Sequence, residues 1–224
     1  SAPLSDVCGL RRGPAPGRAG GRRGGHRRDG GGVDGGARNV GGDDAVVLVK
    51  SLLAGALSKR GRFLEIERPD GSWVQYDLEY NLLRTKRLRI DKRMIVELVG
   101  GGNRPDLSVS LKDTVIAVGE IKGRVDLSNL WESWMPTIAD HLRSWSQQYE
   151  DSARLFFGTV ISQEMVSGIS LAEGTPRVGL RELHERGWLT GAYNLSKIAE
   201  KDSKALWAFD HLVGRLMALL DGGG

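Results

Sequence analysis

Two apolar segments separated by a very short polar connection constrain the fold of this chain more than any other feature. Residues 107–111 and 115–122 are strand-like and are joined by Lys112-Asp113-Thr114. A connection of this length joins antiparallel strands, because parallel strands need a much longer crossover. The sequence therefore predicts an antiparallel β-hairpin with its turn centred on Asp113.

This turn fixes the pairing of the two predicted strands. It sets three opposed pairs: Asp106 with Glu120, Ser108 with Val118, and Ser110 with Ile116. Opposed side chains have Cβ atoms about 4.5–5.5 Å apart, and Lys122 shares the face of Glu120 because side chains alternate. The same register gathers apolar side chains on the other face: Leu107, Val109, Leu111, Ala117 and Ile121. One face is thus predicted to join the core while the other collects two acids and a lysine.

Two opposed carboxylates repel each other unless a positive charge neutralises them. A hard divalent cation such as Mg²⁺, which prefers oxygen ligands, would do so, and the Ile121 carbonyl is the expected third protein ligand. Lys122 beside the cation would position a water and stabilise charge on a phosphate. The alternative is a purely structural hairpin in which Asp106 caps a turn and Glu120 and Lys122 form a surface ion pair.

At these residues the sequence resembles the PD-(D/E)XK nuclease superfamily. Pro105-Asp106 and Glu120-Ile121-Lys122 match its motif, with thirteen residues between the acids, and the resemblance covers residues 44–161. It implies Mg²⁺-dependent hydrolysis of phosphodiester bonds, with Asp106 and Glu120 as metal ligands and Lys122 at the attacking water. It also implies a further acid from upstream, for which Glu79 is preferred slightly over Glu97.

The rest of the chain predicts an α/β fold with a mixed central β-sheet flanked by helices, and the resemblance implies that this is a restriction-endonuclease-like core. A helix is expected from Asp44 to Lys59, a strand hairpin over 63–78, and a strand over 94–99. A helix over 127–149, with Pro136 as a kink, precedes a strand over 154–161. Helices over 180–186 and 198–220 complete the pattern. The predicted domains are a tail of residues 1–42 and a nuclease domain of residues 43–224.

The first 44 residues contain 14 of the 32 glycines and 8 Arg against 5 Asp. Such a segment buries too little apolar surface to offset its backbone entropy, so a disordered tail is expected. It is either an Arg/Gly arm that adds phosphate affinity or a dispensable extension. The remaining residues hold 24 basic and 23 acidic groups, so net charge is a weak argument for DNA binding.

Composition excludes several other classes of protein. The single cysteine, Cys8, rules out an intramolecular disulfide framework and is typical of a reducing compartment, so a cytoplasmic location is expected. The four histidines and one cysteine lack zinc-finger spacing. A phosphate-binding loop of the G-x-x-x-x-G-K type is also absent from the sequence, which does not support ATP-driven cleavage.

Within the superfamily, the resemblance is greatest to type II restriction endonucleases, which implies an enzyme acting on double-stranded DNA. A homodimer is expected because palindromic sites match twofold symmetry, and a cognate DNA methyltransferase is expected in the same system. The DNA-binding candidates are Arg104, Arg124, Asn129, His141 and Arg143, with the basic run from Arg84 to Arg89 as a further phosphate contact. The alternatives are a junction-resolving or repair nuclease of the same superfamily, or a non-catalytic DNA-binding module.

Overall fold

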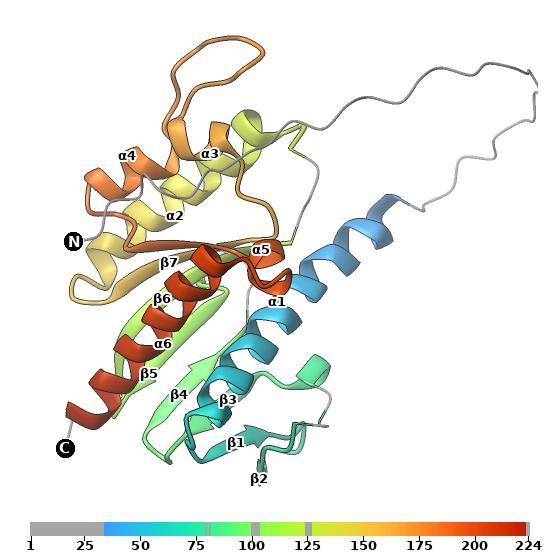
Figure 1. Cartoon of the computed structure of the whole chain (residues 1–224), viewed down its shortest axis with the longest axis vertical. Coiled ribbons are helices and arrows are strands. Elements are labelled where there is room, and N and C mark those ends of the chain that lie inside the picture. The colour runs from blue at the N-terminus through green and yellow to red at the C-terminus, as the bar shows by residue number, and fades with distance from the viewer. Residues whose placement is uncertain (1–33, 79, 81, 100–103, 124–126, 223–224) are drawn as a thin grey trace, which may run out of the picture.

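The computed structural model describes residues 34–78, 80, 82–99, 104–123 and 127–222 (Figure 1). Its strands are β1 (Leu64–Glu67), β2 (Trp73–Gln75), β3 (Arg87–Ile90), β4 (Met94–Glu97), β5 (Leu107–Leu111), β6 (Thr114–Lys122), β7 (Ala153–Gly158) and β8 (Gly191–Asn194). Its helices are α1 (Asp34–Lys59), the 3-10 turn η2 (Leu82–Arg84), the π-helix η3 (Leu130–Trp134), α2 (Met135–Gln148), α3 (Gln163–Ser167), α4 (Leu180–Glu185), α5 (Leu195–Ala199) and α6 (Ser203–Gly222).

Within these residues, the eight strands form one mixed sheet in the order β2-β1-β3-β4-β5-β6-β7-β8. Strands β1 to β6 pair with antiparallel neighbours, whereas β6, β7 and β8 run parallel to one another. Each parallel step contains helices, namely η3 and α2 before β7 and α3 and α4 before β8, because a parallel connection must cross the sheet. The predicted α/β class with a mixed sheet is confirmed.

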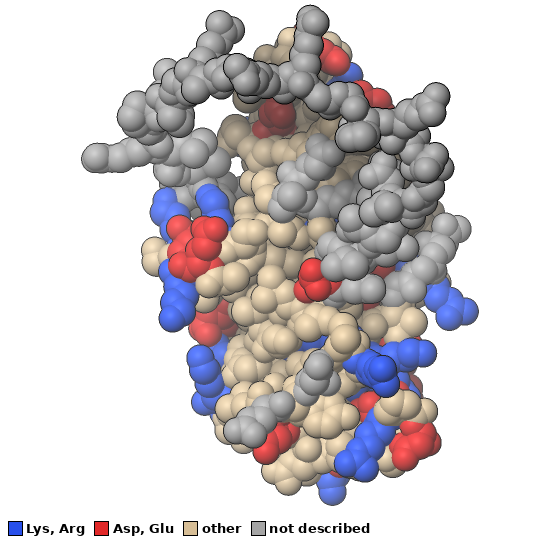
Figure 2. All heavy atoms as spheres, turned by 90° about the vertical axis from the view of Figure 1, so that its right-hand side faces the viewer, with Lys and Arg blue, Asp and Glu red and all other residues tan. Residues whose placement is uncertain are grey.

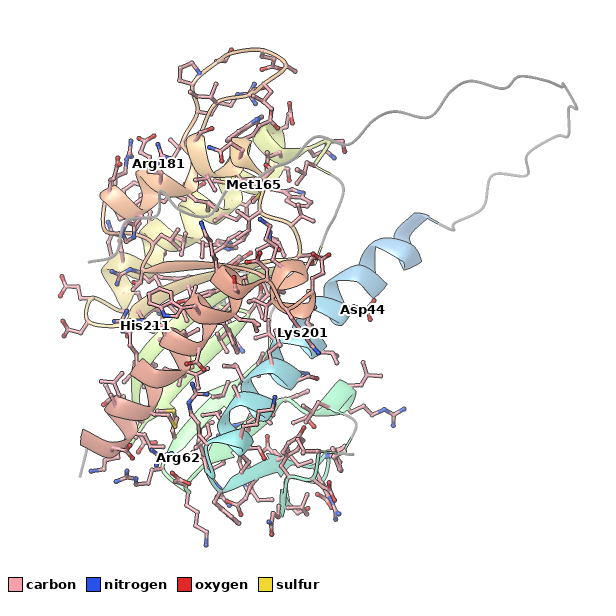
Figure 3. All side chains as sticks on the ribbon, in the orientation of Figure 1. Asp44, Arg62, Met165, Arg181, Lys201 and His211 are labelled. Atoms are coloured by element: carbon pink, nitrogen blue, oxygen red, sulfur yellow. The ribbon has the colours of Figure 1, made fainter. Side chains whose placement is uncertain are left out.

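Helices cover both faces of the sheet, in two separate layers (Figure 1). Helices α1, α5 and α6 pack on one face over a core that includes Leu53, Ile90 and Phe157. Helices α2, α3 and α4 pack over the β6–β8 end of the other face. In Figure 3, Met165 and Arg181 mark this second layer, and His211 marks the first. None of the helices in the described ranges is both long enough and apolar enough to cross a membrane.

Helix α1 confirms the predicted apolar stripe but not the predicted start. Val49, Leu53 and Leu57 are buried, with relative exposures of 0–1%, and Val46 packs against them. The helix begins at Asp34 instead of Asp44, although the added segment contains four glycines, which disfavour helix. The predicted disordered tail lies outside the described residues as far as residue 33.

The other predicted elements differ mainly at their boundaries. The hairpin over 63–78 is confirmed as β1 and β2, with the Asp70 carboxylate accepting from the backbone N–H and the hydroxyl of Ser72 in the turn. The single helix predicted over 198–220 is wrong. It is divided into α5 and α6 at Lys201, which has a left-handed φ of 61°, and Asp202 caps α6 by accepting from the Ala205 N–H.

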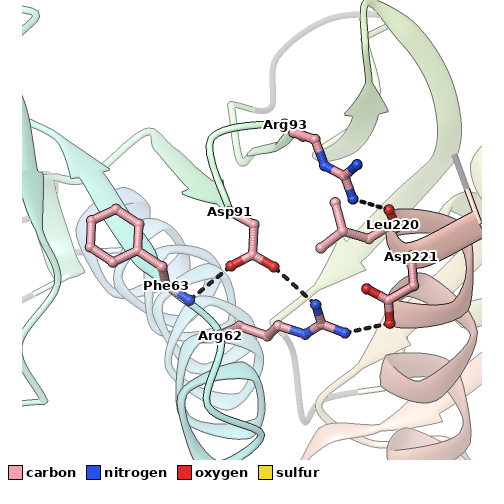
Figure 4. Close-up of polar contacts among 6 residues, drawn as sticks. All are labelled: Arg62, Phe63, Asp91, Arg93, Leu220 and Asp221. Atoms are coloured by element: carbon pink, nitrogen blue, oxygen red, sulfur yellow. Dashed lines mark hydrogen bonds and ion pairs between the residues drawn. The ribbon is translucent and has the colours of Figure 1, made fainter. Parts of the chain in front are cut away.

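Three segments far apart in sequence are tied together by an ion-pair network (Figure 4), which we call the C-terminal clamp. The Arg62 guanidinium, just after α1, lies 3.0 Å from an Asp91 oxygen in the β3–β4 turn and 2.5 Å from an Asp221 oxygen in α6. Asp91 also accepts from the Phe63 N–H at 2.9 Å, and Arg93 donates to the Leu220 carbonyl. The clamp therefore ties the end of α6 to the end of α1 and to the β3–β4 turn.

Replacing Arg62 with Ala is expected to lower the free energy of unfolding by about 1–2 kcal/mol, since it leaves a partly buried Asp91 without its cation. Urea unfolding midpoints measure this loss. The matched control is Arg60→Ala, because Arg60 pairs with an Asp210 side chain that is 69% exposed. The control should cost at most about 0.5 kcal/mol. Equal losses in the two variants would contradict a stabilising role of the clamp.

Candidate active site

The β5–β6 hairpin has the predicted strand pairing near Asp106 and Glu120 but a different pairing next to its turn. The turn has two residues, Lys112 and Asp113, both with positive φ (49° and 67°), as a type I′ turn requires. Leu111 therefore pairs with Thr114, and Ser110 pairs with Val115, so the predicted pairing of Ser110 with Ile116 is wrong.

A β-bulge between Val109 and Ser110 then shifts the register by one residue. Ile116 is the extra residue on β6, because Val109 pairs with Ala117. From this point the pairing follows the prediction: Ser108 opposes Val118, as predicted, and Leu107 opposes Gly119. Asp106, one residue before β5, is thereby brought to the level of Glu120 and Ile121.

The two faces of the hairpin separate as the sequence predicts. The α1–α6 side takes apolar side chains that are at most 7% exposed: Leu107, Val109, Ala117 and Ile121. Val118 belongs to the core under α2, so Glu120 and Lys122, two and four residues on, share that face. Helix α2 is thus the layer that the acidic side chains meet.

Asp106, Glu120, Lys122 and His141 form the cluster that we call the β5–β6 site. The Asp106 Oδ2 accepts from the Ile121 N–H at 2.9 Å. One Glu120 oxygen, Oε1, lies 2.5 Å from the Lys122 Nζ, and the other, Oε2, lies 3.0 Å from the Nδ1 of His141 on α2. The three predicted catalytic residues are therefore brought together, with a histidine added from the helix layer.

The two carboxylates of the site occupy different electrostatic environments. The Glu120 side chain is only 3% exposed, and its charge is balanced by Lys122. Burial raises the pKa of the Asp106 carboxyl, and the nearby Glu120 charge raises it further. The repulsion expected between the two acids is thus seen at Asp106, whereas the Glu120 carboxylate has Lys122 and His141 beside it.

Asp106→Asn is therefore expected to raise the Tm by a few degrees at pH 7–8 in EDTA. Asn keeps an oxygen acceptor for the Ile121 N–H but removes the charge whose burial raises the pKa. The pKa of Asp106 in the folded state lies above its ordinary value. Ionisation of Asp106 therefore lowers the stability of the parent as the pH rises through the folded-state pKa, and it has no such effect below the ordinary pKa. The gain should disappear as the pH falls toward 4.

Thermal unfolding of parent and variant across this pH range measures the effect. The control is Glu97→Gln, which neutralises a carboxylate that is 50% exposed and should leave the Tm unchanged at every pH. A lower Tm of Asp106→Asn at neutral pH would mean that the Asp106 charge stabilises the fold without metal.

The donor set of the site fits a hard cation. Among the described residues none donates a hydrogen bond to the Asp106 Oδ1, and the raised pKa of this carboxyl shows that a positive charge nearby would be favourable. The N–H and C=O of one strand residue point to the same side, and the Ile121 N–H points to Asp106, so the Ile121 carbonyl opens on that side too. The proposed ligands are therefore two carboxylates and one main-chain carbonyl, because within the described residues no three His, Cys, Asp or Glu side chains are arranged to hold a metal ion.

Of the two upstream acids, Glu79 lies outside the described residues. Glu97, at the end of β4, pairs with Ser108 and so shares the sheet face of Asp106, as its diagonal neighbour. Its carboxylate lies 4.0 Å from the Arg87 guanidinium, at the edge of ion-pair distance. The structure therefore brings Glu97 next to the site without placing it in the cluster.

The other predicted DNA-binding residues lie on different segments of the chain. Arg104 and Asn129 are exposed on segments before β5 and η3. Arg143 is also exposed and pairs with Asp140 one turn away on α2. Arg124 lies outside the described residues. These residues stay candidates by exposure alone.

The basic run before β4 is partly neutralised within the sheet. Arg87 and Arg89 on β3 pair with Glu67 and Glu65 on β1, at 3.1 and 2.8 Å, and the Arg89 guanidinium lies 4.3 Å from the ring centroid of Trp73. Figure 2 shows one face of the molecule, on which Lys and Arg are interspersed with Asp and Glu. On this face, surface charge therefore adds little to the argument for DNA binding.

His141 is the site residue whose position the sequence interpretation missed, since the sequence suggested it only as a DNA-binding candidate. It lies three residues after Ile138 and four before Trp145, which are both buried. This spacing puts the histidine beside the apolar stripe of α2, and its side chain is only 20% exposed. That periodicity was the available signal, but nothing in the sequence identifies Glu120 as its partner.

Comparison with known proteins adds no family to this geometry. No protein-family model matches the chain, and no curated protein matches it.

Proposed function

We propose that this protein is a Mg²⁺-dependent endonuclease that hydrolyses phosphodiester bonds of double-stranded DNA, in the manner of a type II restriction enzyme. The observation that supports this most is the convergence of Asp106, Glu120 and Lys122 at the open end of the β5–β6 hairpin. The resemblance of these residues to the PD-(D/E)XK motif supports it as well, as does a mixed sheet with helices on both faces.

In this proposal Asp106, Glu120 and the Ile121 carbonyl hold the metal ion, which would supply Lewis-acid stabilisation of the phosphate. The Ile121 N–H keeps the Asp106 carboxylate at the hairpin end through the bond to Oδ2. Lys122, whose side chain is 29% exposed, orients the attacking water and stabilises negative charge on the phosphate. The Glu120 carboxylate, at 3% exposure, is the more buried of the two groups, so the Lys122 amine is the more accessible to substrate.

The direct test is cleavage of supercoiled plasmid and of large linear DNA by purified protein in Mg²⁺, with EDTA as control. Discrete fragments that reappear in every digest support the proposed function. Preferential cutting of branched substrates would indicate a junction-resolving or repair nuclease instead. DNA binding that needs no metal, with no cutting under any condition, would indicate the non-catalytic DNA-binding module.

The proposed restriction function carries two further expectations about partners. A homodimer is proposed because a palindromic site presents the same phosphates to two copies related by a twofold axis. Light scattering at micromolar concentration tests it. A cognate DNA methyltransferase is proposed because host DNA needs protection, and methylation of the recognition site should block the fragments.

A further inference from the structure

We infer that His141 is a positioning residue of the β5–β6 site, which holds the Glu120 carboxylate in its working orientation. This inference rests on the proposed function and deepens it. The observation behind it is the 3.0 Å contact between the His141 Nδ1 and the Glu120 Oε2. The contact joins helix α2 to strand β6 across the boundary between the helix layer and the sheet.

The imidazole ring is itself held in place by a second contact. It stacks on Trp145, one turn further along α2, with ring centroids 5.4 Å apart and an interplanar angle of 28°. Trp145 is 1% exposed, so this platform belongs to the core and does not rotate freely. The His141 ring therefore has little freedom to turn away from Glu120.

The hydrogen bond also has a defined direction. A metal-binding Glu120 carboxylate, as proposed, is ionised and offers only acceptors, so in the proposed site the hydrogen of this contact belongs to Nδ1 of His141. The Lys122 Nζ holds the second Glu120 oxygen at 2.5 Å. With both oxygens held, the carboxylate cannot rotate about its last bond without breaking one contact. Groups that hold a metal-binding carboxylate in this way typically change metal affinity or activity by about 10–100-fold when removed.

Such a role differs from DNA contact, which the sequence suggested for this residue. A DNA contact would affect substrate affinity, whereas a positioning residue affects the bound cation and the rate at saturating DNA. Three variants separate these roles: His141→Ala removes the donor, and His141→Asn keeps a nitrogen donor bonded to Cγ, as in Nδ1. His141→Gln moves that donor one bond further out.

The experiment uses the full chain and a duplex that the parent cuts. It measures single-turnover cleavage in Mg²⁺ at saturating duplex, duplex affinity without metal, Ca²⁺ binding by calorimetry, and Tm. His141→Ala and His141→Gln should cut about 10–100-fold more slowly and bind Ca²⁺ about 10-fold more weakly, with duplex affinity unchanged. His141→Asn should recover most of both losses.

The control is His184→Ala. The His184 Nδ1 donates to the Leu189 carbonyl at 2.9 Å in the same helix layer, so the control alters an equivalent histidine hydrogen bond outside the β5–β6 site. It should cut and bind Ca²⁺ like the parent. Parental cutting and Ca²⁺ binding by His141→Ala would overturn the inference alone. Weaker duplex binding by His141→Ala, together with a parental cleavage rate at saturating duplex, would also overturn the inference alone. A parent that neither cuts DNA nor binds Ca²⁺ would overturn the proposed function, and this inference with it.

Discussion

Lys122→Ala is expected to lower the rate of DNA cleavage by about 10²–10⁴-fold while leaving Mg²⁺ binding near the parental level. The lysine lies against Glu120 but, being a cation, is not a metal ligand in the proposed site. Its removal loses one contact that holds the Glu120 carboxylate but also removes a charge that repels the metal ion, so the two effects on Mg²⁺ binding oppose each other. Its removal takes away the group that orients water and stabilises phosphate charge. Single-turnover cleavage and Ca²⁺ calorimetry measure the two effects separately.

Lys122→Arg keeps the charge and is the matched variant. It should not rescue cleavage well, because a guanidinium is planar, bulkier and not deprotonated in proteins. Lys112→Ala, in the exposed turn at the other end of the hairpin, is the control and should cut like the parent. If Lys122→Ala cuts at nearly the parental rate, the β5–β6 site is not the active site.

Glu120→Gln is expected to abolish measurable cleavage and to weaken Ca²⁺ binding, because it removes a charged oxygen ligand from the proposed site. It should also lower the free energy of unfolding by about 1–2 kcal/mol in EDTA, since the Lys122 ammonium and the His141 ring lose a buried anion. Partial exposure of both partners keeps this loss below that of a completely buried pair. Urea unfolding measures it.

The sign of this stability change is the informative feature. Asp106→Asn should stabilise the metal-free protein at neutral pH, whereas Glu120→Gln should destabilise it, although both remove a carboxylate from the same site. Glu120→Asp, which keeps the charge on a shorter side chain, should lose less stability than Glu120→Gln and still cut poorly. Destabilisation of both the Asp106 and Glu120 variants at neutral pH would instead indicate a structural hairpin.

Local periodicity was sufficient for much of the fold. The alternation that separates Leu107, Val109, Ala117 and Ile121 from Glu120 follows from strand geometry and a buried face, so it predicted which layer each side chain joins. The sequence interpretation missed strand β3, because Arg87 and Arg89 occupy its less buried positions and read as part of a basic run. Only Leu88 and Ile90 show that it belongs to the core. The short strand β8 offers four residues of intermediate burial, too few for a clear period.

The hairpin register illustrates two offsetting errors. The sequence interpretation placed a three-residue turn at Asp113, whereas the chain makes a two-residue turn and recovers the register through the bulge at Ile116. A bulge depends on how β6 must bend between β5 and β7. It is a feature of the pairing between two strands, so the residues of β6 taken alone do not reveal it.

The sequence by itself determined the α/β class, the apolar stripe of α1, and the sharing of one hairpin end by Asp106, Glu120 and Lys122. These follow from short-range periodicity and from the residue types that a buried strand tolerates. Only the tertiary structure decided that Glu120 pairs with both Lys122 and His141, while Asp106 bears the cost of burial. The physical reason is that charge balance depends on which groups from distant segments share a buried space, and α2 reaches Glu120 only when it packs on the sheet.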